Sequence, residues 1–220
     1  MIYLLICTIL LLVILCYIYF DKNLNDISKK ILLKSGLDDN IKMCKEILKM
    51  LGNTHTQVEY NKEENSNLSY YNHSKDIVIM KKKEDNLRVI NIAHECIHTI
   101  QKKRFLAANK FFSNLQMIYF LFSLIFIILS EKFEMELIFI QLLILLGTLF
   151  VKVVIEGDAS YRSVSLAEKY LKTKIENQEA EEYALQCGQI IYDTMAIYYI
   201  NFLLQGMFMI ITNIILAFIF

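Results

Sequence analysis

Four long apolar blocks constrain what this chain can fold into more than any other feature of its sequence. They cover Ile2–Phe20, Leu115–Leu129, Leu137–Ile155 and about Met195–Phe220. A helix rises about 1.5 Å per residue, so about 20 apolar residues cross a hydrocarbon core of about 30 Å. We therefore expect about four transmembrane helices, the middle two joined into a hairpin by the short acidic turn Ser130–Glu136.

The first apolar block, Ile2–Phe20, has a second interpretation as a secretory signal peptide. No basic segment precedes it, and no small-residue cleavage site follows it. A signal peptide would have both a basic segment before its apolar run and a cleavage site after it. We therefore expect this block to be a retained membrane anchor.

The basic residues predict the orientation of these helices. Of the 23 lysines and arginines, 17 lie between Asp21 and Phe112, five lie between Val151 and Asp193, and Lys132 lies in the hairpin turn. Basic segments stay on the cytoplasmic side of a membrane. We expect both polar segments to be cytoplasmic at a bacterial plasma membrane, with both termini outside. The formal net charge of zero gives no reason to expect a nucleic-acid partner.

The apolar blocks divide the chain into five parts. We expect a transmembrane anchor (1–20), a cytoplasmic domain (21–112), a transmembrane hairpin (113–155), a cytoplasmic helical segment (156–192) and a C-terminal transmembrane helix (193–220). The fold class that follows is mainly α, a multi-pass membrane protein with a small α/β cytoplasmic domain.

The cytoplasmic domain carries signals of both secondary-structure types. Ile41–Leu51 has the apolar spacing of a helix and ends at Gly52, a residue typical of helix termini. Thr56–Tyr60 and Asp76–Met80 are predicted strands, separated in part by the polar loop Asn61–Ser69.

The chemically most informative stretch is His94-Glu95-Cys96-Ile97-His98, an HExxH sequence. A helix places residues i and i+4 on one face, so both imidazoles can reach one metal ion. The intervening Glu95 is offset around the helix, where it can hold and deprotonate a metal-bound water. The motif predicts a zinc hydrolase.

The helix that carries this motif is predicted to begin near Asp85 or Asn86, either of which could cap it. One face is apolar: Val89, Ala93, Cys96 and Ile100. The two histidines fall on a neighbouring face. The alternative without a function is that an exposed helical face carries two histidines and a glutamate by chance.

Catalytic zinc needs a third protein ligand. We expect it to be Glu156, which directly follows the third apolar block and returns to the same membrane face as the HExxH helix. Asp158 is expected to orient a histidine through its free ring nitrogen. The alternative is that both are ordinary juxtamembrane acids. His55 and His73 are weaker ligand candidates in loops, and the five cysteines show neither paired metal spacing nor a disulfide pattern.

A basic cluster, Lys102-Lys103-Arg104, follows the motif and is typical of contact with lipid headgroups. We therefore expect the motif at the cytoplasmic membrane surface. Metalloproteases that cleave within the membrane carry HExxH inside a spanning helix and a Pro-containing Asp-Gly motif, whereas this chain has no proline.

In the order of these pieces the chain resembles the YugP-type bacterial membrane zinc metallopeptidases. The resemblance covers an N-terminal anchor, a small polar domain, HExxH with Ile100-Gln101 after it, a hydrophobic hairpin, the run Glu156-Gly157-Asp158-Ala159-Ser160 with Arg162, and a C-terminal span. It implies a zincin-like domain in which His94, His98 and Glu156 bind Zn²⁺ and Glu95 is catalytic. The chain departs from the family at Ile97, where a glycine is usual, and at Val154-Ile155, where a proline is usual. It also has Ser69-Tyr70 in place of an Asp-His step.

The function predicted from these observations is that of a membrane-embedded zinc metallopeptidase. Glu95 would act as general base on zinc-bound water, and the substrates would be membrane proteins or peptides presented at the bilayer surface. An extended substrate could pair with Asp76–Met80 as an added strand. The alternatives are a proteolytically inactive zinc-binding membrane scaffold or chaperone, and a structural membrane protein in which the motif is incidental.

Overall fold

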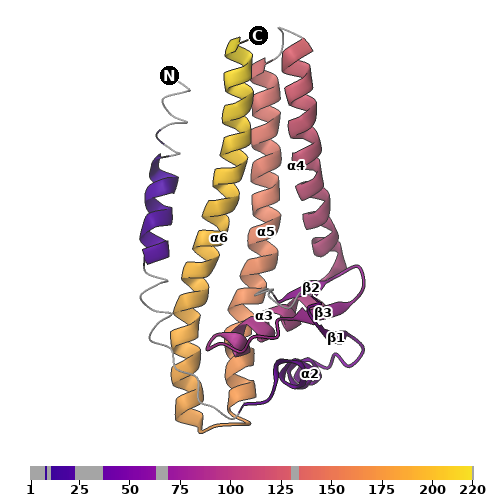
Figure 1. The fold of residues 1–220 in the computed structure, drawn as a ribbon, viewed down its shortest axis with the longest axis vertical. Helices are drawn as coiled ribbons and strands as arrows, with labels where there is room; N and C mark the ends of the chain where they lie inside the picture. The colour runs from indigo at the N-terminus through magenta and orange to yellow at the C-terminus, as the bar shows by residue number, and fades with distance from the viewer. Residues whose placement is uncertain (1–7, 9–10, 23–36, 63–68, 130–133, 220) are drawn as a thin grey trace. The chain divides into compact units, whose positions relative to one another are not determined.

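The structure is a computed structural model that describes Thr8 and residues 11–22, 37–62, 69–129 and 134–219 (Figure 1). It is mainly helical, and residues 11–22 are helical. The other elements are α2 (Asn40–Met50), β1 (Gln57–Tyr60), β2 (Tyr70–Asn72), β3 (Ile77–Met80), α3 (Arg88–Ile100), α4 (Lys103–Leu129), α5 (Glu134–Leu171) and α6 (Asn177–Ile219). The first part of the expected anchor, the middle of the loop Asn61–Ser69 and most of the turn Ser130–Glu136 lie outside the described residues.

The chain divides into two compact units. The mixed unit consists of Asn23–Lys103 and Ile155–Thr194, and it contains the sheet together with α2 and α3. The helical unit consists of Met1–Lys22, Arg104–Val154 and Met195–Phe220. Both α5 and α6 contribute to each unit, because each is one helix that continues past the boundary.

The sheet of the mixed unit has three strands in the order β1-β3-β2. β1 runs parallel to β3, and β2 runs antiparallel to it with Tyr71 opposite Val78. The two predicted strands are confirmed, while the three-residue strand β2 was not predicted. The expectation that a substrate adds to Asp76–Met80 is wrong, because β3 is the central strand and already pairs on both sides.

The helix α2 follows directly from its local sequence. Asp39 caps its first turn by accepting hydrogen bonds from the backbone N–H groups of Ile41 and Lys42, each at 3.0 Å. Gly52 follows its end with a φ of 72°, a conformation that glycine adopts without strain. The predicted helix and its terminus are thus confirmed within one residue at each end.

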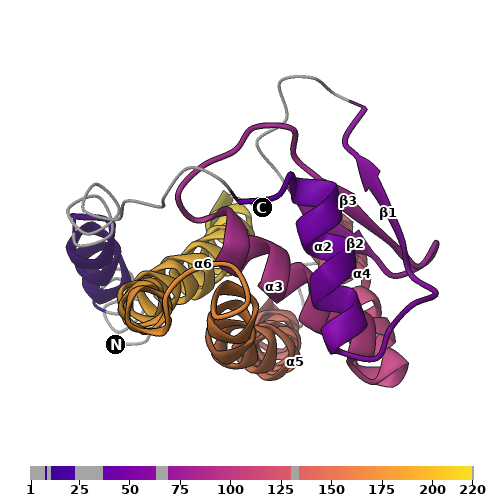
Figure 2. The same cartoon turned by 90° about the horizontal axis from the view of Figure 1, so that it is seen from below.

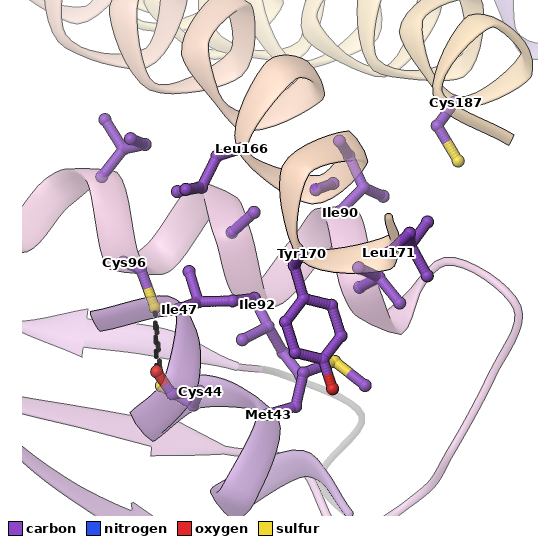
Figure 3. Packing of buried hydrophobic residues seen from close by; sticks show 14 of the residues in the cluster. Met43, Cys44, Ile47, Ile90, Ile92, Cys96, Leu166, Tyr170, Leu171 and Cys187 are labelled. Atoms are coloured by element: carbon purple, nitrogen blue, oxygen red, sulfur yellow. Dashed lines mark hydrogen bonds between the residues drawn. The ribbon is translucent and has the colours of Figure 1, made fainter. Parts of the chain in front are cut away.

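The core of the mixed unit lies where α2, α3 and β3 meet the parts of α5 and α6 in this unit. Seen from below, α3 lies beside α2 on one side and beside α5 on the other (Figure 2). Tyr170 of α5 is fully buried and reaches toward Met43 of α2 and Ile92 of α3 (Figure 3). In the same core the sulfur atoms of Cys44 and Cys96 lie 3.5 Å apart. The apolar face of α3 is therefore fixed on two sides.

The start of α3 differs from the prediction. The helix begins at Arg88, and Leu87 occupies the N-cap position without a side-chain hydrogen bond. Asp85 instead accepts a hydrogen bond from the backbone N–H of Leu87 through its side chain and one from Arg88 through its carbonyl, both at 3.2 Å. Asp85 therefore forms the turn before the helix and not its cap.

Within the part of the chain that the structure describes, three helices are long and apolar enough to cross a membrane, in agreement with three of the four predicted spans. They are Lys103–Leu129, Met135–Leu171 and Asn177–Ile219. The helical unit contains the apolar parts of these helices, and many of its large apolar side chains are exposed: Ile118, Ile125, Leu129, Phe139, Phe150, Phe208 and Phe218. Exposed apolar surface of this kind is typical of contact with lipid.

Polar side chains and one glycine lie between the helices of the helical unit. Asn213 of α6 donates to Ser123 of α4 at 2.7 Å and to Gln141 of α5 at 2.5 Å, and all three residues are buried. At Gly206 the helices α5 and α6 approach so closely that an added Cβ would clash with the end of the Leu145 side chain. Small residues and interhelical hydrogen bonds of this kind hold helices together where lipid removes the hydrophobic drive.

Two segment boundaries differ from those expected. α4 already begins at Lys103, and residues 104–112 belong to the helical unit and not to the small domain. α5 continues without interruption through Glu156 to Leu171. The expected third ligand therefore lies within a long helix and not at its end.

Candidate metal centre

The helix α3 holds both histidines of the HExxH sequence on one side. Ala93, Cys96 and Ile97 are buried in the core, which fixes the rotation of the helix about its axis. His94 and His98 then lie one turn apart, with ring centroids separated by 4.8 Å and ring planes at 86°. Both side chains are largely buried, being 18% and 10% exposed.

Glu156 on α5 completes a group of three possible ligands with these histidines. Its Oε2 atom lies 3.3 Å from Nε2 of His94 and 3.6 Å from Nε2 of His98, and the two Nε2 atoms are 3.1 Å apart. Among the described residues, this is the one group of His, Cys, Asp or Glu side chains that could hold a metal ion. Residues that are far apart in the sequence thus converge on one point.

The spacing of these three atoms fits a small tetrahedral metal ion. Zinc binds imidazole nitrogen and carboxylate oxygen at about 2.0–2.1 Å, so its tetrahedral ligands stand roughly 3.3–3.4 Å apart. The three observed separations, from 3.1 to 3.6 Å, surround that value. Two imidazoles and a carboxylate are also a donor set of catalytic zinc sites. The residues present therefore fit the metal that the sequence predicts.

The outer ring nitrogen of His98 contacts a glutamine. Nδ1 of His98 lies 2.8 Å from Oε1 of Gln101, whose Nε2 donates to the carboxylate of Asp158 at 2.9 Å and to the carbonyl of Ile155 at 2.8 Å. Asp158, expected to orient a histidine, therefore contacts Gln101, and Gln101 contacts the imidazole. Sequence reasoning gave Gln101 no role, although its position three residues after His98 places it within reach.

The outer ring nitrogen of His94 has a different neighbour. Oγ of Ser160 lies 3.3 Å from Nδ1 of His94. Ser160 follows Glu156 by four residues on α5, so both face the same side of that helix. This i, i+4 spacing was the signal that could have identified Ser160 from the sequence.

Glu95 lies outside the three-residue group and contacts the sheet. Its Oε2 atom accepts a hydrogen bond of 2.8 Å from the backbone N–H of Tyr71, in strand β2. Burial raises the pKa of Glu95, and the nearby histidines and the Tyr71 N–H oppose this only in part. A glutamate with a raised pKa is suited to accept and return a proton near neutral pH.

Tyr71 is itself held by a polar network. Its hydroxyl donates to Oδ1 of Asp76 at 2.8 Å, and Thr56 donates to the same oxygen at 2.9 Å. Asp76 has a φ of 52°, in the left-handed region that non-glycine residues seldom adopt. Asn53 extends the network, because its amide donates to Thr56 and to Thr99 of α3. The strand segment that contacts Glu95 is thus tied back to the helix of Glu95.

The charges around His98 favour a cation at this position. Burial alone would disfavour the charged imidazole, but the hydrogen bond and the charge of Glu156 outweigh it. Together with Glu95 and Gln101 they raise the pKa of His98 to about 9. Without a metal, a proton therefore occupies this site at neutral pH.

The two remaining histidines are not part of the group. His55 is exposed and lies 3.7 Å from the carboxylate of Asp76. Nδ1 of His73 is buried and has no hydrogen-bond partner in the part of the chain that the structure describes. Both were expected to be weak ligand candidates, and neither stands with His94, His98 and Glu156.

Comparison with known proteins adds no further information on this site. No family model, no curated protein and no solved structure matches the chain. The chain brings together a His-His-Glu group that could hold a metal ion, and it has helices long enough to cross a membrane.

Proposed function

We propose that this protein is a membrane-bound zinc metallopeptidase similar to the YugP-type enzymes. In this proposal His94, His98 and Glu156 bind zinc, and Glu95 is the general base. The observation that carries it is the convergence of two imidazole nitrogens and one carboxylate oxygen within 3.6 Å. Glu95, the glutamate of the HExxH sequence, lies on α3 together with the two histidines.

The chemistry follows from the roles of these side chains. Zinc held by them would polarise a peptide carbonyl and lower the pKa of a coordinated water from about 15.7 toward about 7. Glu95 would take the proton of the attacking water and return it to the leaving amine. The N–H of Tyr71 holds the Glu95 carboxylate in one orientation for these transfers.

The sheet offers a place for an extended substrate at β2. This strand is an edge of the described sheet and carries the Tyr71 N–H that contacts Glu95. A peptide added along this edge would form main-chain hydrogen bonds next to the general base. In this proposal the substrates are membrane proteins or peptides presented at the bilayer surface.

The decisive experiment compares the wild type with Glu95→Gln. Glutamine keeps the shape of the side chain but cannot take a proton, so we expect self-cleavage or casein digestion to fall at least about 100-fold while bound zinc stays at the wild-type level. Glu59→Gln on the exposed face of β1 is a matched control and should retain activity. Equal activity of wild type and Glu95→Gln would exclude the protease assignment.

That experiment also addresses the inactive scaffold or chaperone. Such a protein would bind zinc in both forms and cleave nothing in either. The third alternative, an incidental motif, predicts that zinc content does not depend on the motif. Metal analysis of purified His94→Ala decides this point, because unchanged zinc content in that variant would exclude the metal site.

We also propose that the site faces the cytoplasm, on the basis of the basic residues in the polar segments. The native Cys44 and Cys187 are buried and therefore poor probes of sidedness. Ser74, in the turn between β2 and β3, is exposed. A Ser74→Cys variant should react with a membrane-impermeant maleimide only after the cells are permeabilised. Labelling in intact cells would reverse the orientation.

A further inference from the structure

We propose that Gln101 is a positioning residue that fixes the orientation and tautomer of His98 and joins the two helices that carry the metal ligands. The inference rests on the metal site of the proposed function, but it does not depend on proteolysis. It makes Gln101 a determinant of metal affinity, although Gln101 itself binds no metal.

Both the nitrogen and the oxygen of the Gln101 side-chain amide form hydrogen bonds. Its nitrogen faces two groups that can only accept, the carbonyl of Ile155 at 2.8 Å and the carboxylate of Asp158 at 2.9 Å. A reversed amide would place oxygen against both acceptors and would be repelled. The oxygen Oε1 must therefore be the atom 2.8 Å from Nδ1 of His98.

This fixed amide determines which nitrogen of His98 carries hydrogen. Because Oε1 of Gln101 can only accept, Nδ1 of His98 must be the donor. When His98 gives up its second proton to bind a metal ion, the lone pair is therefore left on Nε2, the atom that lies near Nε2 of His94 and the carboxylate of Glu156. A neutral imidazole with a free Nε2 lone pair is the form that binds a metal ion.

The partner of His94 does not determine which ring nitrogen carries the hydrogen. Ser160 is at 3.3 Å from its Nδ1, longer than the contact of His98, and a hydroxyl can donate or accept. Ser160 therefore does not select a tautomer. The two histidines differ in this respect, and the more buried one has the fixed partner.

Gln101 also connects segments that the sequence separates by more than fifty residues. It stands at the C-cap of α3, where the backbone leaves the helix with φ −68° and ψ 152°. Its amide bonds the carbonyl of Ile155, the residue directly before Glu156 in α5. The bond to Asp158 is exposed, so the contacts with His98 and Ile155 should contribute most.

A carboxylate could not replace this amide. It would accept from His98, but it would face the Asp158 carboxylate and the Ile155 carbonyl with no hydrogen to donate. Changing Asp158 to asparagine in the same protein would supply a donor opposite the new carboxylate. This exchange of donor and acceptor separates a positioning role from a general effect on folding.

The test is the zinc dissociation constant of the full-length protein in detergent, measured by competition with a chromogenic chelator. We expect Gln101→Ala to weaken zinc binding by about 10- to 100-fold, the usual effect of removing a partner of a ligating histidine. Ser160→Ala, the matched control on His94, should weaken it less. Gln101→Glu should weaken binding, and adding Asp158→Asn should recover part of that loss, because the Ile155 carbonyl still faces the new carboxylate.

Two results would overturn the inference. One is zinc binding by Gln101→Ala within about twofold of wild type; the other is no recovery in the double variant. If Gln101→Ala fails to fold, shown by circular dichroism without metal, the comparison of Gln101→Glu with the double variant decides. Wild type that binds zinc but cleaves nothing would exclude the protease and leave this test readable. Wild type that binds no zinc would exclude both proposals.

Discussion

The two units of this protein place their apolar side chains in opposite ways. The mixed unit buries them, and Met43, Ile47 and Tyr170 are fully shielded in its core. The helical unit exposes them: Ile125 is 60% exposed and Phe208 is 70% exposed. One unit is therefore built around an apolar interior, and the other has the exposed apolar surface that is typical of helices in lipid.

The polar side chains show the same contrast. Around the metal group of the mixed unit, Gln101, Ser160 and Tyr71 provide a partner for each imidazole and for Glu95. In the helical unit the buried Asn213 and Gln141 bond each other, yet Oδ1 of the first and Nε2 of the second have no partner in the described structure. Polar groups thus define the site in one unit and join helices in the other.

Metal removal should have the largest effect, and it should affect one unit only. With free zinc about 1,000-fold above the dissociation constant, binding stabilises the folded state by about 4 kcal/mol, which EDTA would remove. Hydrogen exchange should then accelerate in α3 and remain unchanged in residues 195–219 of α6. His94→Ala is the control, since EDTA should not change its exchange. Equal acceleration in both units would mean that they unfold together.

Truncation of the same residue type in each unit comes next. Ile47→Ala in the core of the mixed unit should lower the free energy of unfolding by about 2–5 kcal/mol, because it leaves a cavity. Ile125→Ala in α4, whose side chain is exposed, should change it by less than about 0.5 kcal/mol. Chemical unfolding of both variants in one detergent measures the difference. Similar losses would show that Ile125 packs against protein.

The pH dependence of metal binding should be a somewhat smaller effect than the truncation of Ile47. The pKa of His98 in the metal-free fold, about 9, lies above the ordinary value of about 6.5. Its charged form thus stabilises the metal-free fold below pH 6.5, and this contribution is lost as the pH rises through 9. Metal affinity depends on pH in the opposite direction: it rises with pH, because His98 must lose a proton before it can bind the metal.

We therefore expect zinc affinity to rise roughly tenfold per pH unit from pH 7 to 9, about 2.7 kcal/mol in all. Chelator competition, corrected for protonation of the chelator, measures this rise. A constant affinity over this interval would show that His98 is already neutral at pH 7. The helical unit should show no matching change in thermal stability.

The smallest effect is expected for the polar cluster of the helical unit. Asn213→Ala removes two interhelical hydrogen bonds, and such bonds contribute about 0.6 kcal/mol on average and about 1.7 at most. Thr212→Ala is the control, because the Thr212 hydroxyl donates to the Phe208 carbonyl of its own helix and forms no interhelical hydrogen bond with a described residue. Unfolding in mixed micelles with increasing SDS compares the two. A loss well above 2 kcal/mol would give this cluster a larger role than joining helices.

Much of the fold could be predicted because its signals are local. The apolar blocks gave α4, α5 and α6, and apolar periodicity with Gly52 gave α2. The strand β2 was missed because its three residues, Tyr70–Asn72, are too few to show an alternating pattern, and its pairing with β3 depends on tertiary packing. The start of α3 was misplaced because Asp85 forms a turn before the helix.

The candidate site divides in the same way. His94 and His98 were identifiable because i and i+4 share a helix face, and Glu156 followed from the expected return of the hairpin. Asp158 was expected to orient a histidine directly, whereas the amide of Gln101 lies between Asp158 and His98. Sequence spacing does not show which of two polar side chains, a carboxylate or an amide, contacts the histidine.

The sequence by itself thus determined the apolar helices, the helix that carries HExxH and the residue types able to bind a metal. These depend on the periodicity of neighbouring residues, which backbone geometry converts directly into a face. Only the tertiary structure decided that β3 is central, that the Tyr71 N–H holds Glu95, and that Gln101 joins α3 to α5. These contacts join residues that are 24 and 54 positions apart. Their geometry depends on how the core packs, and no local pattern records it.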